Sequence, residues 1–435
     1  MGWAMAFETQ KIGLFFRFRK GLGYLGKYLT DSDVALIGLN SFEPGGGYKH
    51  GGEKCYSGPF KAEHLAKCGD LFISTTDITQ DGRVLGSPFI FPNLSNVYSE
   101  VIFSHDIVKA IPISPGLSPN HLANILRIPR YRKSIANAST GTTVRRVPVD
   151  VIGELEVPVP PIAIQNAICA FVDSLDEKIR LNTEMSKTLE AIAQTIFKSW
   201  FIDFDPVHAK MRGEKPEGMD DATAALFPDS FDESELGMIP KGWEVKSLDA
   251  IARFLNGLAL QKFPPHDGSD NLPVIKIAQL RAGNTTGADF ASKQIKSEYI
   301  IKDGDILFSW SGTLEVEYWT GGDGALNQHL FKVTGNTVPD WFAFLATRYF
   351  LEDFRSIARS KATTMGHIQR GHLTEAKMPL ADTGLLGVAD SIISPLIELL
   401  VSKRIEANQL AALRDALLPR LISGELEIPD EMLAS

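Results

Sequence analysis

The stretch IAIQNAICAFVDSLDEKIRLNTEMSKTLEAIAQTIFKSW, residues 162–200, predicts one long helix. Its apolar residues recur every three or four positions, which places them on a single face. With a rise of about 1.5 Å per residue, this helix would be about 58 Å long. A helix of this length with one apolar stripe usually packs that stripe against a partner helix. The predicted stripe consists of Ile164, Ile168, Phe171, Leu175, Ile179, Asn182, Met185, Leu189, Ile192 and Ile196.

A second helix with the same pattern is predicted near the C-terminal end, and the two are expected to pair as an antiparallel coiled coil. Asn182 and Asn408 fall on or near the expected seam, where each either fixes the register or faces solvent. Pro395 is expected in the first turn of the second helix or at a kink, because proline interrupts a helix interior. The second stripe consists of Ile392, Leu396, Leu400, Ile405, Asn408, Leu410, Leu413, Leu417 and Leu421.

The segments before the two helices match one another in order, which indicates an internal duplication. Ser134-Ile-Ala recurs as Ser356-Ile-Ala, and the offset between matching positions downstream stays near 221 residues. Chance could supply one match, but the preserved order favours two copies of a unit in which a globular domain precedes a helix. Further matches are Gly69–Ser74 with Gly304–Ser309, Thr142-Thr143 with Thr363-Thr364, Arg146 roughly with Arg370, and Glu154–Pro158 with Glu375–Pro379.

Each globular unit is predicted to be α+β. Short β-rich segments alternate with loops that contain glycine and proline, and a helical stretch follows at residues 121–138 and 340–360. The predicted strands are Val34–Gly38, Leu71–Thr75, Val101–Ser104, Pro273–Ile277, Ile306–Trp310 and His329–Val333. The expected organisation is a first domain at 1–160, a helix at 161–205, an acidic linker at 206–240, a second domain at 241–382, a helix at 383–425 and a tail at 426–435.

The net charge of -9 is unevenly distributed. The segment 208–240 carries eight acidic and three basic residues, and the tail from Gly424 onward adds four acidic residues. The remainder is therefore close to neutral. Within it, residues 107–149 contain seven basic residues and no acidic one. This cluster is either a solvated face or a surface that neutralises phosphates, so the acidic total does not argue against nucleic-acid binding.

A basic helix followed by a loop occurs in both copies, which favours contact with DNA. Arginine and lysine neutralise phosphates, threonine hydroxyls hold phosphate oxygens, and arginine, glutamine and histidine can read base edges. The candidate DNA-binding residues are Arg127, Arg130, Arg132, Lys133, Thr142, Thr143, Arg145 and Arg146 in the first copy, and Arg355, Arg359, Lys361, Thr363, Thr364, His367, Gln369 and Arg370 in the second.

No catalytic or metal-binding constellation is recognised in the sequence. The three cysteines are scattered and are typical of a reducing cytosol. The sequence contains no phosphate-binding loop, zinc-protease motif or nucleophile elbow, and no predicted membrane span. His329 is interpreted as a structural residue of a strand, and Asp70 and Asp305 as turn residues. A non-catalytic protein of the cytoplasm is therefore expected.

Several specific strings make the chain similar to a known family. The sequence resembles the specificity subunit of type I restriction–modification systems over nearly its whole length. The strings are QTIFKSWFIDF at 194–204, LGMIPKGWEV at 236–245, PVIKIAQL at 273–280, ALNQHLFKV at 325–333 and LRDALLPRLISGE at 413–425, together with the segments 48–77 and 363–379. The first copy begins with MGWAMAFETQKIG and shows no counterpart of LGMIPKGW, so its opening segment is expected to differ or to be missing.

The resemblance implies two α/β target recognition domains, each reading one half of a split sequence in double-stranded DNA. Two conserved helices would separate these domains, set the gap between half-sites and bind two methyltransferase subunits. Two motor–nuclease subunits would join for restriction. The resemblance implies no cofactor for this chain, whereas the complex would use S-adenosylmethionine, and ATP and Mg2+ for restriction. Two alternatives remain open: a one-chain methyltransferase or nuclease, which would bind S-adenosylmethionine by itself, and a helical scaffold that binds only protein.

Overall fold

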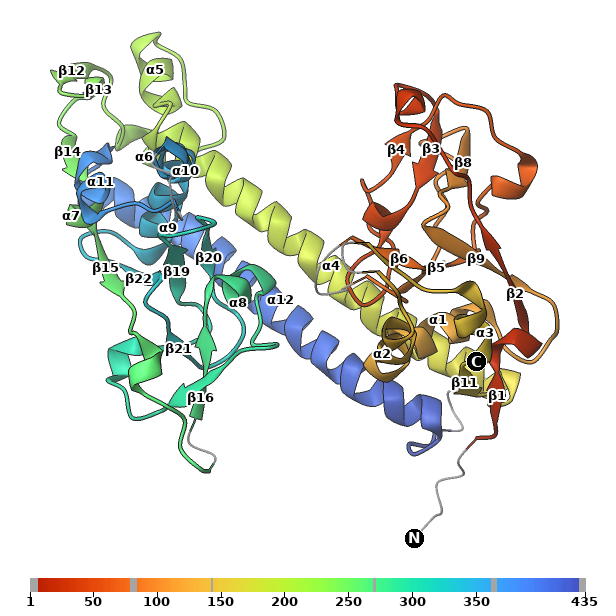
Figure 1. Cartoon of the computed structure of the whole chain (residues 1–435). Helices are drawn as coiled ribbons and strands as arrows, with labels where there is room; N and C mark the ends of the chain where they lie inside the picture. Colours follow the sequence, from red (N-terminus) through yellow and green to blue (C-terminus); the bar gives the residue numbers. More distant parts are fainter. Residues whose placement is uncertain (1–6, 79–83, 142–143, 269–270, 361–365, 430–435) are drawn as a thin grey trace. The chain divides into compact units, whose positions relative to one another are not determined.

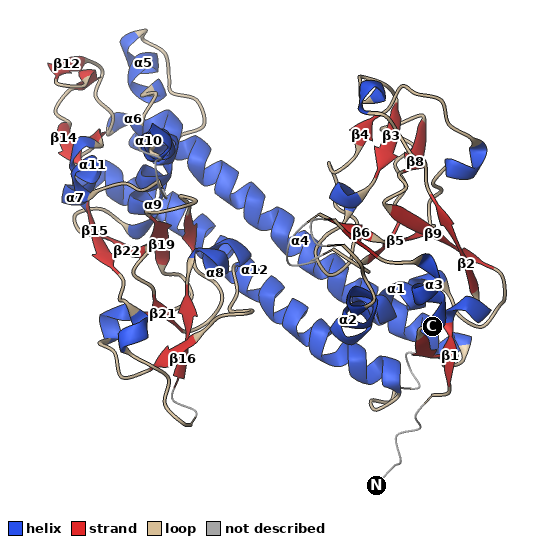
Figure 2. Cartoon of the chain, in the orientation of Figure 1, coloured by secondary structure: helices blue, strands red, loops and turns tan. Residues whose placement is uncertain are grey.

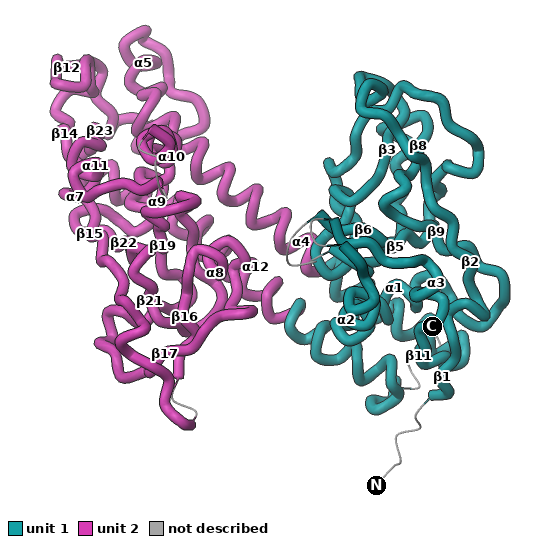
Figure 3. Tube along the Cα trace, in the orientation of Figure 1, with its two compact units in different colours: residues 1–177, 411–435 teal, residues 178–410 magenta. Residues whose placement is uncertain are grey.

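A computed structural model describes residues 7–78, 84–141, 144–268, 271–360 and 366–429. The chain divides into two compact units, shown in Figure 3. Unit 1 consists of Met1–Glu177 and Ala411–Ser435, and unit 2 consists of Lys178–Leu410. Each unit contains both strands and helices, as Figure 2 shows, which confirms the α+β prediction.

The domain in unit 1 contains two sheets. One is antiparallel, with the order β2 (Phe16–Lys20), β9 (Ile107–Pro112), β5 (Leu71–Ser74) and β7 (Pro88–Ile90). The other has the order β4 (Lys54–Cys55), β3 (Val34–Ile37) and β8 (Glu100–Phe103), and β3 runs parallel to β8. The domain also contains two separate pairs of short strands. These are β1 (Thr9–Lys11) with β11 (Glu156–Pro158), and β6 (Thr76–Asp77) with β10 (Arg145–Arg146). The helices are α1 (Pro119–Arg127), α2 (Pro129–Asn137) and α3 (Val149–Glu154).

The domain in unit 2 repeats this plan. Its first sheet has the order β15 (Ala252–Asn256), β22 (Leu330–Gly335), β19 (Ile306–Ser309) and β20 (Val316–Tyr318). Its second has the order β17 (Phe290–Ser292), β16 (Asn271–Ile275), β21 (Gly324–Leu326) and β18 (Ile300–Ile301), and β16 runs parallel to β21. The strand β14 (Glu244–Ser247) pairs with β23 (Lys377–Leu380). The helices are α7 (Leu248–Ile251), α8 (Ile277–Ala282), α9 (Asp340–Tyr349), α10 (Leu351–Ser360) and α11 (Arg370–Glu375).

Equivalent strands and turns establish the predicted duplication. The two main sheets have the same strand order, and each domain has one parallel strand pair in its second sheet. Asp70 accepts a hydrogen bond from the backbone N of Lys67 and pairs with Lys109. Asp305 does the same with Lys302 and Lys332 in unit 2. These acids are therefore turn residues, as predicted, and each also holds a lysine of the neighbouring strand.

The strand that follows LGMIPKGW in the second copy has a counterpart in the first, whereas the expected difference of the opening segment itself stays a prediction, because residues 1–6 lie outside the described residues. Strand β1 pairs antiparallel with β11, just as β14 pairs with β23. The sequence comparison missed this correspondence because the ladder needs only backbone groups and an extended chain, so the side chains of the two strands need not match.

The two long helices are α4 (Ile162–Phe201) and α12 (Thr383–Ser423), and both contribute residues to each unit. Within unit 2 they run antiparallel, because Ser186 lies against Leu400 and Lys178 pairs with Glu406 at 3.5 Å. Pro395 lies well inside α12, so the first-turn alternative is wrong. The predicted seam is partly wrong as well. Ile168, Leu189 and Leu400 are buried as predicted, but Met185, Ile192, Ile392 and Leu413 are exposed.

Helix α12 is long and apolar enough, by length and composition alone, to cross a membrane. One face of α12 in unit 2 packs within the protein: Ile393, Ile397 and Leu400 belong to the core. Two of its polar residues have protein partners, because Arg404 pairs with Glu190 and Asn408 donates hydrogen bonds to the carbonyl oxygens of Gly283 and Thr320. We therefore interpret α12 as a helix packed within the protein, as the sequence indicated.

The acidic segment expected to be a linker at 206–240 is folded. It begins within α5 (Asp205–Met211), continues through α6 (Asp221–Ala225) and ends in a hairpin of β12 (Phe231–Ser234) and β13 (Gly237–Pro240). Its acidic side chains are exposed, while Val207, Phe227 and Ile239 join the core of unit 2. The acidic composition suggested a linker. The segment is folded nevertheless, because a few apolar side chains suffice to fix a short segment on the core.

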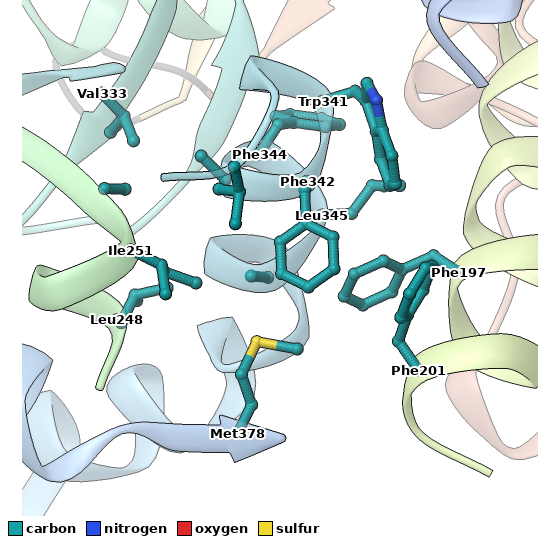
Figure 4. Packing of buried hydrophobic residues seen from close by; sticks show 14 of the residues in the cluster. Phe197, Phe201, Leu248, Ile251, Val333, Trp341, Phe342, Phe344, Leu345 and Met378 are labelled. Carbon is teal, nitrogen blue, oxygen red and sulfur yellow. The ribbon is translucent and has the colours of Figure 1, made fainter. Parts of the chain in front are cut away.

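Aromatic packing joins the second domain to α4. Helix α9 lies beside β22, as Figure 1 shows. Phe342 on α9 is fully buried, and its ring lies 5.2 Å from the rings of both Phe197 and Phe201 on α4. Figure 4 shows the Phe342 ring pointing toward these two side chains. Burial of aromatic side chains dominates core energetics, so this cluster stabilises the attachment of the domain to the helix.

His121 on α1 should make unit 1 sensitive to acid. It is fully buried, and neither ring nitrogen has a hydrogen-bond partner among the described residues. Burial lowers the pKa of His121 from 6.5 to about 4. As the pH falls below 6.5, the unfolded chain takes up this proton before the folded chain does. The contribution is thus complete above pH 6.5 and is lost as the pH falls through about 4.

We therefore expect the free energy of unfolding of unit 1, relative to that of the His121→Leu variant, to fall by about 3 kcal/mol between pH 7 and pH 4. Hydrogen exchange of unit 1 amides in both proteins, measured across this range, gives the difference. Parallel pH profiles for the two proteins would contradict the expectation.

Candidate functional site

Arg127, a predicted DNA-binding residue, is held against α4 in unit 1. Its guanidinium donates hydrogen bonds to both carboxylate oxygens of Asp176, at 2.5 and 3.1 Å. Arg414 of α12 donates to the same carboxylate at 2.6 Å. Burial acts to raise the pKa of Asp176, but the two arginines outweigh it and hold the pKa below its ordinary value. The carboxylate is therefore ionised, and Arg127 attaches the domain to the helices.

Unit 2 contains an equivalent attachment. Arg348 lies near the end of α9, as Arg127 lies at the end of α1, and pairs with Glu190 of α4 at 2.6 Å. Arg404 of α12 pairs with the other oxygen of Glu190 at 2.7 Å. Glu317 on β20 contacts both arginines, at 3.4 and 2.9 Å. Two arginines and two carboxylates thus form a closed ring that joins the domain to both long helices.

The basic residues of α2, which follows Arg127, differ in their exposure. Arg130 and Lys133 are exposed, and the Arg130 guanidinium stacks on Tyr131 at 4.7 Å. Arg132 is partly buried, and burial, with Arg127 nearby, lowers its pKa below the ordinary value although Asp415 acts in the opposite direction. Its Nε atom has no hydrogen-bond partner among the described residues. Arg130 and Lys133 are therefore the cations of this helix that solvent reaches most readily.

The basic loop of unit 1 is described only in part. Thr142 and Thr143 lie outside the described residues. Arg145 donates hydrogen bonds to Ser139 Oγ at 3.0 Å and to the Ala136 carbonyl oxygen at 2.8 Å, so it closes the loop onto the end of α2. Arg146 is exposed and reaches the cleft described below.

In unit 2, Lys361, Thr363 and Thr364 lie outside the described residues. Arg355 is half-buried and donates to the Leu314 carbonyl oxygen at 3.0 Å, whereas Arg359 is exposed. Gln369 is exposed at the start of α11. Arg370 donates to the Phe254 carbonyl oxygen at 3.2 Å, and its guanidinium lies 5.7 Å from the Phe331 ring.

Equivalent backbone bonds correct the match between the two basic loops. Val147 N donates to Thr75 O at 2.9 Å in unit 1, and Ile368 N donates to Trp310 O at 3.0 Å in unit 2. Arg146 precedes the donor in unit 1, and His367 precedes the donor in unit 2, so these two residues are counterparts. Arg146 is bridged to Thr76 in the strand ladder, and His367 is bridged to Ser311 by an isolated antiparallel bridge. Arg370 is three residues too far along the chain to be the counterpart of Arg146.

A cleft of about 370 Å³, lined by both polar and apolar side chains, opens beside Arg146 in unit 1. Its lining includes Asn40, Lys54, Thr76 and His105. His105 and Asp106 belong to the turn between β8 and β9, where His105 Nε2 lies 3.5 Å from the Asp106 carboxylate. The cleft thus presents hydrogen-bond donors and acceptors from two sheets.

A cluster of polar and aromatic side chains lies at the corresponding edge of unit 2. Trp310 Nε1 donates to Asn256 Oδ1 and to the Gln328 carbonyl oxygen, each at 3.1 Å. The His329 ring lies 5.8 Å from the Trp310 ring, and His329 Nδ1 lies 3.0 Å from Ser311 Oγ. The His367 ring lies 6.3 Å from that of Trp310. His329 therefore does not lie in a hydrophobic core; it forms part of a half-buried polar cluster.

Most of this arrangement was not predicted from the sequence. Only Arg146 and His367 of the two clusters were among the predicted residues, and Trp310 and Gln328 had attracted no functional interpretation. The signal that could have found them is the duplication itself. Once the copies are aligned on Gly69-Asp70 and Gly304-Asp305, positions that differ within an otherwise repeated frame become visible.

Comparisons with known proteins support the same family. The family model described as "Type I restriction modification DNA specificity domain" matches residues 61–191 and 240–383, more than half of the chain. The type I restriction enzyme HindI specificity subunit of Haemophilus influenzae is 25% identical over 421 residues, which cover 85% of this chain and 89% of the relative. The MjaIX specificity subunit of Methanocaldococcus jannaschii is 24% identical over 325 residues, which cover 72% and 71% of the two chains.

A solved structure has a similar fold. The crystal structure of the S subunit of a type I restriction–modification system from M. genitalium aligns with a TM-score of 0.50, covers 97% of each chain and shares 15% sequence identity. At this identity the likeness concerns the fold alone. The two matches of the family model, one in each copy, give the assignment: the chain belongs to the family of type I restriction modification DNA specificity domains.

Proposed function

We propose that the chain is the DNA sequence-specificity subunit of a type I restriction–modification complex in the cytoplasm. Each recognition domain reads one half of a split target in double-stranded DNA, and the bound subunit directs the methyltransferase and restriction subunits to it. The observation that carries this proposal is the occurrence of two specificity domains with the same fold in one chain. Two readers joined by helices of fixed length can select two half-sites at a fixed spacing.

The chemistry of the complex belongs to its partners under this proposal. Two methyltransferase subunits supply S-adenosylmethionine-dependent methylation, and two motor–nuclease subunits use ATP and Mg2+ for restriction. Methylation of a base within a duplex requires that the base be turned out of the stack. The recognition domains hold the flanking duplex in place for that step, so this chain contributes position and sequence selection and no covalent step.

The exposed cations of the two domains supply contacts to phosphates. Arg130 and Lys133 on α2 and Arg359 on α10 are exposed. Arg127 and Arg145 are engaged within unit 1, so we leave them out of the interface. Phosphate contacts position a protein on DNA without reading its sequence.

Salt dependence tests the proposal directly. The logarithm of the binding constant should fall linearly with the logarithm of the salt concentration, with a slope near −0.9 for each phosphate contact. Fluorescence anisotropy of the complex with its methyltransferase subunit on a labelled target gives this slope. Arg359→Ala should reduce the slope by about 1. Association that is insensitive to salt, or no binding to DNA, would favour a protein-binding scaffold instead.

An exposed apolar stripe on α4 provides the surface for the methyltransferase subunit. Leu181, Met185 and Ile192 are 46%, 45% and 43% exposed, and their spacing of four and seven residues places them on one face. On α12, Ile392 and Leu399 are also exposed and lie seven residues apart. Exposed aliphatic residues in rows at helical spacing are suited to packing against further helices of a partner.

Aspartate at Met185 and Ile192 should separate the subunits without unfolding this chain. We expect the double variant Met185→Asp, Ile192→Asp to retain the methyltransferase subunit at least about tenfold more weakly, because each charge would be buried in the interface. Ala191→Asp is the control, since it places the same charge on an exposed position of α4 outside the stripe. Co-purification and analytical ultracentrifugation measure the difference. Equal retention by the double variant and the control would exclude this surface.

A further inference from the structure

We infer that each recognition domain discriminates bases through one sheet-edge site, built at equivalent backbone positions in the two domains and filled with different side chains. The sheet-edge site comprises residues 75–76, 105–106 and 146 in unit 1, and residues 310–311, 328–329 and 367 in unit 2. This inference rests on the proposed function and assigns its selectivity to particular residues.

The backbone frame of the site is the same in both domains. Thr75 N donates to Asp106 O at 3.1 Å in unit 1, and Trp310 N donates to His329 O at 3.3 Å in unit 2. Residues 105–106 and 328–329 are the two central residues of a four-residue turn. In both domains this turn closes with a hydrogen bond from the backbone N of its fourth residue to the carbonyl oxygen of its first. These bonds are Ile107 N to Ser104 O at 3.2 Å, and Leu330 N to Asn327 O at 3.0 Å.

A close backbone approach next to the site is also repeated. A Cβ atom on Gly21 would lie 2.2 Å from the Phe103 carbonyl oxygen, and one on Gly257 would lie 2.2 Å from that of Asn327. Both positions therefore require glycine, because no side chain fits against the turn that follows β8 or β21. The frame and its steric requirement have thus been kept in both copies.

The side chains on this frame have not been kept. Structural positions nearby retain their chemistry, since Asp70 and Asp305 each hold a lysine of the adjacent strand. At the sheet-edge site four of the five pairs differ in charge, size or hydrogen-bonding groups, whereas Thr76 and Ser311 both keep a hydroxyl group. The pairs are Thr75 with Trp310, Thr76 with Ser311, His105 with Gln328, Asp106 with His329, and Arg146 with His367.

Repeated backbone with exchanged side chains is the pattern that two readers of different half-sites require. A site that stabilised the fold would keep its side chains, as the aspartate–lysine pairs do. A site that contacted only phosphates would keep its cations, because phosphates are alike along the duplex. Base edges differ in their donors and acceptors, so residues that read them must differ when the half-sites differ. The inference therefore also requires that the two half-sites be different sequences.

The chemistry of each version suits base edges. In unit 1, Arg146, His105 and Asp106 line a cleft and offer both donors and a carboxylate acceptor. In unit 2, Gln328 is half-buried, and its Oε1 atom has no hydrogen-bond partner among the described residues. An amide side chain that offers an acceptor beside its donor can pair with adenine, and a carboxylate can accept from cytosine. The Gln328 oxygen is buried in unit 2, so the amide group must turn outward before a base can pair with it.

Near-isosteric exchanges test the inference without a large change in packing. The complex of this chain with its methyltransferase subunit would methylate a plasmid library with randomised half-sites, and sequencing would read the modified positions. We expect Gln328→Glu to lose about tenfold or more discrimination at one or more positions of one half-site and none at the other. Asp106→Asn should have the same effect on the opposite half-site. His266→Ala, an exposed histidine of unit 2 outside the site, is the control.

The outcomes separate this inference from the proposed function. Preferences of both variants that stay within about twofold of wild type at every position would overturn the inference, and so would two identical half-sites in the wild-type target. If the wild-type complex methylated no split sequence at all, the proposed function itself would be wrong. Binding by each variant to non-specific DNA at the wild-type level shows that it is folded.

Discussion

Replacing Glu190 by alanine is expected to destabilise unit 2 by about 3 kcal/mol, the lower end of the range for breaking a buried ion pair. Among the described residues, the variant leaves Arg404 and Arg348 with Glu317 as their one carboxylate partner. The side chain of Glu190 is 10% exposed, whereas those of Arg348 and Arg404 are 33% and 24% exposed, so water relieves part of the loss. Because Glu190 joins both arginines to α4, the attachment of the second domain to the helix should weaken most.

Tryptophan fluorescence during urea unfolding measures this effect selectively. Five tryptophans, Trp200, Trp243, Trp310, Trp319 and Trp341, belong to unit 2, whereas Trp3 lies outside the described residues. Glu184→Ala is the matched control on the same helix, since Glu184 makes an exposed ion pair with Arg180. Exposed pairs of this kind contribute about 0.5 kcal/mol or less. A loss for Glu190→Ala no larger than that of Glu184→Ala would show that the ring of charges does not hold the domain.

Phe342→Ala should destabilise unit 2 by about 3–5 kcal/mol, because it removes a large buried ring and leaves a cavity. The Phe342 ring contacts Phe197 and Phe201, so the loss falls on the packing between α9 and α4. For a domain of this size the midpoint of thermal unfolding should fall by roughly 10 °C.

The control for this variant is Tyr349→Ala at the end of the same helix, where the side chain is about half exposed. Its effect should be clearly smaller, because less apolar surface leaves the protein interior. Thermal unfolding followed by tryptophan fluorescence compares the two variants. Equal shifts of the two midpoints would mean that α9 does not dock through Phe342.

Periodicity and repetition in the sequence predicted the architecture well. The predicted strand Leu71–Thr75 is β5 within one residue, and the helix predicted from Ile162 is α4. The duplication follows from matches that local packing preserves, such as the turn at Asp70 and Asp305 that fixes a lysine in each copy. These features are local, so they can be read from short stretches of sequence.

Features that depend on tertiary contacts were predicted less well. Met185 was predicted to lie on the seam but is exposed. Apolar residues spaced by three and four positions cover a wide face of a helix, and the part of that face that is buried depends on what packs against it. Arg127 was interpreted as a DNA contact because it lies in a basic cluster. Its partner in the structure, Asp176, is 49 residues away in the sequence and could not be identified from the cluster. Asn182 is buried, whereas Asn408 reaches the second domain through Thr320.

The candidate site was predicted least well, again for a physical reason. Base-reading residues must vary with the target, so they form no fixed motif. Gln328 and Trp310 come together only because a turn and a strand end meet at one sheet edge. The basic loops were matched out of register by three residues, because Arg370 resembles Arg146 in type while the backbone pairs His367 at that position.

Methylation mapping tests the central claim most directly. The chain would be expressed with its methyltransferase subunit in a host without other DNA methylation, and every modified base in the genome would be read by sequencing. The account predicts methylation at one split sequence, with two unlike half-sites at a single fixed spacing, and no such methylation when the chain is omitted. Methylation at an unbroken sequence, at many spacings, or at the same sites without the chain would contradict it.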